Sequence, residues 1–256
     1  MIDARAIVDP AAEIDERVSI GPFSIIGAGV RIGAGTDVGP HVVIRGETRI
    51  GRDNRIFQFS SIGEDPQDKK YGGEPTRLEI GDRNQIREFA TIHRGTAQGG
   101  GVTRIGDDNL LMAYTHVAHD CQIGNQVIMA NAASLGGHVR VDDWAILGGF
   151  TVVHQFCHIG AHSFSGMGSV ISKGVPPYVM VAGNPAHARG INSEGLKRRQ
   201  FSSEQISRIK KAYRTLYSSE LLVKDAISQI EAACADCPEV QPFLQFLRAS
   251  ERSFVK

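Results

Sequence analysis

The sequence has no formal net charge at pH 7 and no long hydrophobic run, and each of these absences argues against a class of protein. Lys and Arg together number 28, and so do Asp and Glu, so no overall field draws the chain to nucleic acid or to an anionic membrane. No apolar run is long enough to cross a bilayer and no segment reads as a signal peptide. We therefore expect a cytoplasmic protein that neither binds nucleic acid nor inserts stably into a membrane.

Cysteine is also scarce, with four residues in 256. Cys121 and Cys157 fall among small residues of a repeat and are expected in the core. Cys234 and Cys237 have the spacing of metal ligands, but one pair supplies only two of the ligands that a zinc site needs. We therefore predict a structural role for this pair and no metal.

Branched aliphatic residues recur with a period of six. The first run is Ile2, Val8, Ile14, Ile20, Ile26, Ile32, Val38, Ile44, Ile50, Ile56 and Ile62. The pattern resumes at Ile80, slips by one register, and continues from Ile105 to Ile171 with Ser165 as its one polar member. A helix would return apolar residues every three or four positions and a strand every two. The period of six predicts the hexapeptide repeat of a parallel β-helix.

Two further columns keep the same period. Small or β-branched residues, such as Val18, Ser24 and Val30, stand four positions after each aliphatic and fit a chain that turns inward at a corner. A glycine often follows the aliphatic directly, as at Gly21 and Gly33, and is expected where the φ angle turns positive. Three units would close one triangular turn, so residues 18 apart should stack at roughly 4.8 Å.

The repeat defines a predicted domain organisation. A mostly β domain over residues 1–190 would contain the β-helix, whose repeats run to about residue 175. Polar, Gly-rich segments at 64–77 and 94–104 interrupt it and are expected to project as loops, which in a regular solenoid are usually functional. Residues 191–256 would form a helical domain, because Ser202 and Gln205 resemble a capping box and helical apolar spacing follows.

The candidate chemistry lies where polar residues crowd the late repeats. Six of the nine histidines fall between residues 116 and 162. His119 precedes Asp120, and a histidine oriented by a carboxylate is a plausible general base. Gly137 and then Gln155 follow His119 at intervals of 18, so a backbone N–H would stack beside the base as an oxyanion donor. Asp120, His138 and Phe156 would form the adjacent column.

No serine or cysteine nucleophile is convincing, because Cys121 belongs to the inward column. Direct attack by a substrate hydroxyl, deprotonated by His119, is then the economical mechanism. Solvated or core histidines remain the alternative on these residues alone.

Several segments together resemble the UDP-N-acetylglucosamine O-acyltransferase family, over nearly the whole chain. They are Tyr71–Arg77, Thr91–Thr96, Asp108–Met112, His116–Cys121, Gly137–His138, Val153–Cys157 and Glu194–Arg199. The resemblance implies a left-handed parallel β-helix, a homotrimer, and active sites in grooves between subunits. It also implies transfer of a 3-hydroxyacyl chain from acyl carrier protein to the 3-hydroxyl of UDP-N-acetylglucosamine, the first step of lipid A biosynthesis, without a cofactor.

The resemblance also assigns roles to residues. His119 matches the general base, Asp120 its orienting acid and Gly137 the oxyanion donor. The positions that match those holding the sugar nucleotide and its acylated product are Asp68, Lys70, His116, His138, Gln155, Asn192, Glu194 and Arg199, and His154 matches a further groove histidine. Arg198 and Arg199 would face the acidic carrier protein. Lys69 stands where the family often has an apolar residue, so which of Lys69 and Lys70 contacts the nucleotide stays open.

Met167 is the expected determinant of chain length. It lies 48 positions after His119, which is not a multiple of 18, so it should occupy another face of its own β-helix. The family resemblance implies that a methionine here closes the acyl pocket that a glycine would leave open. We therefore predict a 3-hydroxydecanoyl donor, with ordinary groove filling as the alternative for Met167.

Three other functions fit parts of the pattern. The sister N-acyltransferase of the same pathway has an extra N-terminal domain, whereas these repeats begin at Ile2. A zinc hydratase of the γ-carbonic anhydrase type uses the same coil with three histidines around the metal, and zinc content would distinguish it. A non-catalytic scaffold would leave the crowded polar column and both loops unexplained.

Overall fold

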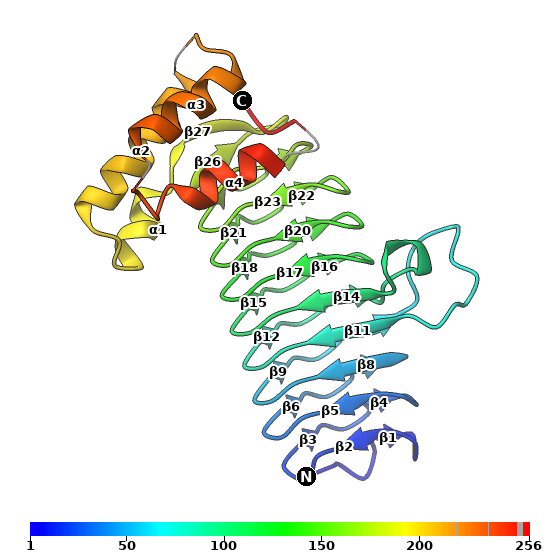
Figure 1. The fold of residues 1–256 in the computed structure, drawn as a ribbon. Coiled ribbons are helices and arrows are strands. Elements are labelled where there is room, and N and C mark those ends of the chain that lie inside the picture. The colour runs from blue at the N-terminus through cyan, green and yellow to red at the C-terminus, as the bar shows by residue number, and fades with distance from the viewer. Residues whose placement is uncertain (219, 235, 250–252) are drawn as a thin grey trace.

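The computed structural model describes residues 1–218, 220–234, 236–249 and 253–256 and contains a left-handed parallel β-helix followed by helices (Figure 1). Its strands form three long sheets, here called sheets I, II and III, one for each side of a triangular prism. Every contact between neighbouring strands within a sheet is parallel except the last pair of sheet III. The fold class predicted from the repeat is confirmed.

The strands are short, and most have two residues. Sheet I contains β1 (Ile7–Val8), β4 (Ile25–Ile26), β7 (Val43–Ile44), β10 (Ser61–Glu64), β13 (Thr91–His93), β16 (His116–Val117), β19 (Ser134–Leu135), β22 (Val152–Val153) and β25 (Val170–Ile171). Sheet II contains β2 (Glu13–Ile14), β5 (Arg31–Ile32), β8 (Glu47–Ile50), β11 (Arg77–Ile80), β14 (Val102–Ile105), β17 (Gln122–Ile123), β20 (Arg140–Val141) and β23 (His158–Ile159). Sheet III contains β3 (Ser19–Ile20), β6 (Asp37–Val38), β9 (Arg55–Ile56), β12 (Gln85–Ile86), β15 (Leu110–Leu111), β18 (Ile128–Met129), β21 (Ile146–Leu147), β24 (Phe164–Ser165), β26 (Val179–Ala182) and β27 (His187–Ile191).

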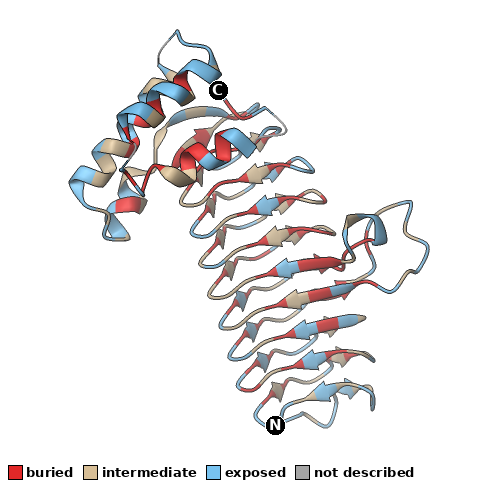
Figure 2. Cartoon of the chain, in the orientation of Figure 1, coloured by how far each residue is buried: buried red, intermediate tan, exposed pale blue. Residues whose placement is uncertain are grey.

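The aliphatic column fills the interior of the prism. Ile44, Ile86 and Leu111 are fully buried, as are small residues of the second column such as Val30, and Figure 2 shows buried segments that recur in successive coils. Ser165 is tolerated in the aliphatic column because it accepts the Gly148 N–H and bonds to the Thr151 hydroxyl, which satisfies its buried oxygen. Burial of apolar surface along the column is therefore the main stabilising contribution.

The prediction for the glycines that follow the aliphatics was mostly wrong. Of Gly21, Gly27, Gly33, Gly39, Gly51 and Gly63, only Gly63 has a positive φ angle. Positive φ angles fall two residues later in the repeat, often at large residues such as Phe23 and His41. The glycines instead allow close approach of coils, since a Cβ on Gly33 would lie 2.7 Å from the carbonyl oxygen of Gly51.

Residues 65–76 and 94–101 lie outside the strands and leave the prism on the same side, whereas the ends of the predicted loops, at Glu64, Arg77 and 102–104, belong to β10, β11 and β14 (Figure 1). The first joins β10 to β11, and the second joins β13 to β14 through a 3₁₀ turn at Ala97–Gly99. Paired strand residues are normally 18 positions apart. The first loop lengthens this interval to 30, as between Ile62 and Ile92, and the second loop lengthens it to 25, as between Thr91 and His116. Arg94 ties the loops together, because its guanidinium donates to the Gly63 carbonyl, the Asp65 carboxylate and the Tyr71 hydroxyl.

The helices pack at the C-terminal end of the prism (Figure 1). They are α1 (Ser193–Arg198), α2 (Ser203–Tyr217), α3 (Val223–Ala233) and α4 (Gln241–Ala249). Ser202 and Gln205 form the predicted capping box of α2. The antiparallel pair β26 and β27 and the short α1 were not predicted, and the hydrophobic core continues from the prism into the helices. The division into domains 1–190 and 191–256 stays a prediction. None of the described helices has an apolar stretch of membrane-spanning length.

An aromatic column joins the helical end to the prism. Trp144, His162 and Tyr178 stack along one corner, and Phe201 packs edge-on against His162. Burial, reinforced by the charge of Arg199, lowers the pKa of His162 to about 4. His162 is therefore a neutral ring within an aromatic stack at pH 7.

We expect this histidine to make stability depend on pH. Its pKa is about 4 in the folded chain and about 6.5 when unfolded, so the unfolded state binds more protons between these values. The free energy of unfolding should fall as the pH is lowered from 6.5 to 4, by about 1–2 kcal/mol from this group after allowance for its partial exposure. His162→Phe keeps the stacked ring and should lose less stability over this range. Equal acid sensitivity of both proteins in denaturant titrations at each pH would contradict the assignment.

Candidate active site

The candidate catalytic residues lie at the corner where strands of sheet I lead into strands of sheet II, here called the I–II corner. His119 follows β16, Gly137 follows β19, and Gln155 follows β22. Hydrogen bonds from His138 N to His119 O and from Phe156 N to Gly137 O, both 3.0 Å, connect the three turns. The stacked columns expected from the interval of 18 are therefore present.

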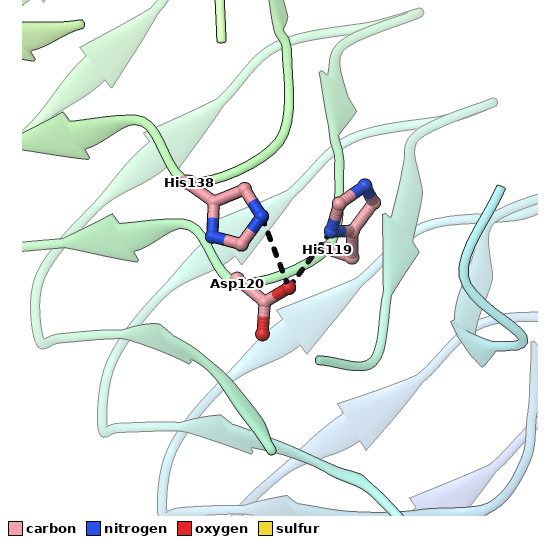
Figure 3. Close-up of side chains that lie close together, drawn as sticks. All are labelled: His119, Asp120 and His138. Atoms are coloured by element: carbon pink, nitrogen blue, oxygen red, sulfur yellow. Dashed lines mark hydrogen bonds and ion pairs between the residues drawn. The ribbon is translucent and has the colours of Figure 1, made fainter. Parts of the chain in front are cut away.

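His119, Asp120 and His138 form a compact cluster (Figure 3). His119 Nδ1 lies 2.8 Å from Asp120 Oδ2, and His138 Nε2 lies 3.7 Å from the same oxygen. Asp120 has a left-handed backbone conformation, with φ of 62°, and only 4% of its surface is exposed. A buried carboxylate that accepts the Nδ1–H of His119 leaves the lone pair on Nε2, which is the form of imidazole that a general base requires.

Gly137 lies beside the His119 ring, as the interval of 18 predicted. A Cβ on this residue would lie 2.6–2.7 Å from Cε1 and Nε2 of His119, so any side chain would collide with the imidazole. Among the described residues no acceptor takes the Gly137 N–H, whereas Gly136 and His138 donate to Val153 O and His119 O. This N–H is therefore available to an oxygen that approaches Nε2 of His119.

His119 of this cluster lines a groove of about 480 Å³. Its lining residues are Gln67, His93, His116, Ala118, His119, Ser134, Leu135, Gly136, Gly137, Val152, Val153, His154 and Gln155. Burial, together with the neighbouring His93 and His119, lowers the pKa of His116 to about 4, and burial also lowers the pKa of His138. Both rings are therefore neutral hydrogen-bonding groups at pH 7. The Thr91 hydroxyl lies 2.8 Å from His116 Nδ1.

The loop at 64–77 brings further candidates to this corner. Asp68 is close enough to His138 for its charge to affect the pKa of that ring. Lys69 and Lys70 are both exposed, so the structure of a single chain does not distinguish them as nucleotide contacts. The Lys70 N–H donates to Asp68 Oδ1 at 3.0 Å, which makes a tight local turn.

The C-terminal candidates lie at a different corner, where sheet II leads into sheet III. Asn192 caps α1 and donates from Nδ2 to His162 O at 3.0 Å, and the Arg199 guanidinium lies 4.9 Å from the centre of the Trp144 ring. Glu194 is exposed and pairs with Lys197 at 2.8 Å, and Arg198 is exposed near the end of α1. One chain does not bring these residues together with His119.

Met167 occupies the third corner, between β24 of sheet III and β25 of sheet I, and 81% of its surface is exposed. It lies away from the I–II corner of its own chain, as its interval from His119 predicted. His154 is exposed and lines the groove at the I–II corner. The candidates are thus divided among three corners of one prism.

The only group of possible metal ligands found among the described residues is His119, Asp120 and His138, whose ligand atoms lie within 4.8 Å of one another. It supplies two histidines, whereas the hydratase alternative needs three. Asp120 already accepts hydrogen bonds from Thr96 and His119. Sequence analysis missed Thr96, because it lies in a loop outside the repeat and has no periodic relation to Asp120.

Comparison with known proteins points to one family. Residues 175–255 match the family model described as Udp N-acetylglucosamine O-acyltransferase, domain 2, and residues 1–46 and 103–137 match bacterial transferase hexapeptide repeats. The acyl-[acyl-carrier-protein]--UDP-N-acetylglucosamine O-acyltransferase of Stutzerimonas stutzeri is 56% identical over 256 residues, and that of Pseudomonas syringae pv. tomato is 58% identical over 256 residues. Each match covers 100% of this chain and 99% of the relative.

Solved structures point to the same family. LpxA from Acinetobacter baumannii has a TM-score of 0.97 at 49% identity, over 100% of this chain and 99% of that one. UDP-N-acetylglucosamine acyltransferase from Francisella novicida has a TM-score of 0.97 at 43% identity, over 100% and 94%. Full-length identity of this size shows common descent of the whole chain, helices included. The chain belongs to the acyl-[acyl-carrier-protein]--UDP-N-acetylglucosamine O-acyltransferase family.

Proposed function

We propose that the protein transfers a 3-hydroxyacyl chain from acyl carrier protein to the glucosamine 3-hydroxyl of UDP-N-acetylglucosamine, the first step of lipid A biosynthesis. The observation that carries this proposal is the His119–Asp120 pair beside the available Gly137 N–H, in a chain whose full-length relatives are named for this reaction. The proposal needs no cofactor, and it places the protein in the cytoplasm with acyl carrier protein as its partner.

The chemistry follows from the two nitrogens of His119. Asp120 accepts the Nδ1–H, so Nε2 takes the proton of the sugar 3-hydroxyl as that oxygen attacks the thioester carbonyl. The oxygen of the tetrahedral intermediate accepts the Gly137 N–H. When the intermediate collapses, the carrier thiol leaves and His119 returns the proton to its sulfur. The thioester C–S bond breaks and an ester C–O bond forms.

The proposed assembly is a homotrimer with the active site shared between subunits. The I–II corner of one subunit supplies the base, and the other corners of a neighbour supply the remaining candidates. Asp68, Lys70, His116, His138, His154 and Gln155 would line the sugar nucleotide from the first subunit, and Asn192, Glu194 and Arg199 from the second. Arg198 and Arg199 would receive the acidic carrier protein.

The proposed reaction is tested by acyl transfer to UDP-N-acetylglucosamine from 3-hydroxydecanoyl- and 3-hydroxymyristoyl-acyl carrier protein. We expect turnover with the shorter donor, and a loss of about 100-fold or more in the His119→Ala variant because the general base is removed. His41→Ala removes a histidine at another corner and is the control, expected to keep full activity. Absence of turnover with either donor, together with stoichiometric zinc, would instead support the hydratase.

The shared site is tested by mixing subunits. His119→Ala and Arg199→Ala carry their defects at different corners, so a site built from two chains is intact when each chain supplies its undamaged corner. In a cyclic trimer that contains both variants, about one site in three should be restored, because one of its three interfaces combines the two undamaged corners. Activity no higher than that of the two parents, in mixed trimers isolated with two affinity tags, would show that each site lies within one chain.

Met167 provides a test of donor length. Met167→Gly removes the side chain that we propose to close the acyl pocket, so transfer from the 3-hydroxymyristoyl donor should rise by about 10-fold or more. Met167→Leu keeps most of the volume and should retain the preference for the shorter donor. The role would be refuted by a Met167→Gly enzyme that is folded, active on the shorter donor and no better on the longer one.

A further inference from the structure

The carboxylate of Asp120 is held by the second loop as well as by His119. The Thr96 N–H donates to Asp120 Oδ1 at 2.9 Å, and the Thr96 hydroxyl donates to Oδ2 at 2.6 Å. Oδ2 is also the oxygen that accepts the His119 Nδ1–H, at 2.8 Å. One residue of the loop therefore binds both oxygens of the carboxylate that orients the base.

The direction of the Thr96 hydroxyl is set by Asp120. A carboxylate oxygen can only accept, so the single hydroxyl proton is donated to Oδ2. The hydroxyl oxygen also accepts the Gly99 N–H at 3.2 Å, a donor that it shares with the Thr96 carbonyl at 3.0 Å, within the 3₁₀ turn that Thr96 caps. Gly99 itself packs against the carboxylate, since any Cβ on it would overlap the Asp120 carboxylate atoms.

Strand β14, which follows this loop, also contacts Asp120. The Asp120 N–H donates to the Thr103 hydroxyl at 2.8 Å, so the left-handed turn at Asp120 is bound on its backbone and its side chain. Thr96 is 1% exposed, Thr103 fully buried and Asp120 4% exposed. With so little access for solvent, loss of a donor would leave the carboxylate under-satisfied, because water cannot readily replace it.

We propose that Thr96 is a positioning residue for catalysis, which holds the Asp120 carboxylate in the orientation that keeps His119 Nε2 free to act as the base. The inference rests on the proposed function. It gives the loop at 94–104 a defined task, which is to complete the hydrogen bonds of the carboxylate. Thr96 touches no reacting atom and acts only through Asp120.

A second buried threonine provides a matched control. Thr115 is also 1% exposed, and its hydroxyl has no hydrogen-bond partner in the part of the chain that the structure describes. A Thr→Val change is close to isosteric and removes the hydroxyl at either position. The two variants therefore differ in whether the lost hydroxyl donates to Asp120.

The test compares Thr96→Val, Thr96→Ser and Thr115→Val in the full enzyme. Because a hydrogen bond to a buried charge is lost, Thr96→Val should lower kcat by about 10- to 100-fold. The KM for UDP-N-acetylglucosamine should change much less. Thr96→Ser keeps the donor and should restore most of kcat, and Thr115→Val should match the wild-type enzyme.

A double-variant cycle separates positioning from general destabilisation. If Thr96 acts through Asp120, adding Thr96→Val to Asp120→Asn should cause little further loss of kcat, because the carboxylate it serves is already gone. A normal kcat in Thr96→Val, or a full additional loss in the double variant, would overturn the inference while wild-type turnover still supports the proposed function. A wild-type enzyme without turnover would overturn both.

Discussion

The structure depends on the stacking of one short coil on the next. Inside a narrow triangular prism, the inward positions must be filled by buried side chains, which are mostly aliphatic, and each coil must hydrogen-bond to its neighbours along the whole length. Those two requirements place residues one turn apart directly above each other. The relation between His119, Gly137 and Gln155 is a consequence of this stacking, since their three turns are joined by backbone hydrogen bonds. The residues proposed as base and oxyanion donor are thus brought together without any long-range loop having to fold around them.

The same stacking decides what could be predicted from the sequence. The sheets, the inward columns and the column of His119 follow from a period, so they could be derived by counting residues. The contacts of Asp68 and Thr96 could not, because the loops that carry them are fixed by particular bonds such as those of Arg94 and the Thr96 hydroxyl. The glycines were misjudged for a related reason. Their position in the repeat was visible in the sequence, but the reason for a glycine there depends on the neighbouring coil. At Gly33 the reason is the close approach of the Gly51 carbonyl, and not a positive φ angle.

A three-sided coil also limits what one chain can do. Its outward residues are sorted to separate corners by their place in the repeat, and no bending of the prism can bring these corners together. His119, Arg199 and Met167 lie at three different corners of the same molecule. Under the proposed function these residues serve one reaction, and only the corners of another copy can supply what the first corner lacks. Oligomerisation would then be a requirement of the geometry rather than an addition to it.

The electrostatics of the groove lead to the same conclusion. Burial lowers the pKa values of His116 and His138, so the imidazoles there are neutral at pH 7. Beside them stand the carboxylates of Asp68 and Asp120. Under the proposed function this corner supplies the general base, and neither lysine nor arginine is among the described residues that line its groove. It does not suit a nucleotide diphosphate, whose charge needs Lys or Arg. Lys70 is exposed on the loop at this corner and Arg199 lies at another corner, so under the proposed function a second subunit supplies the guanidinium that the diphosphate needs.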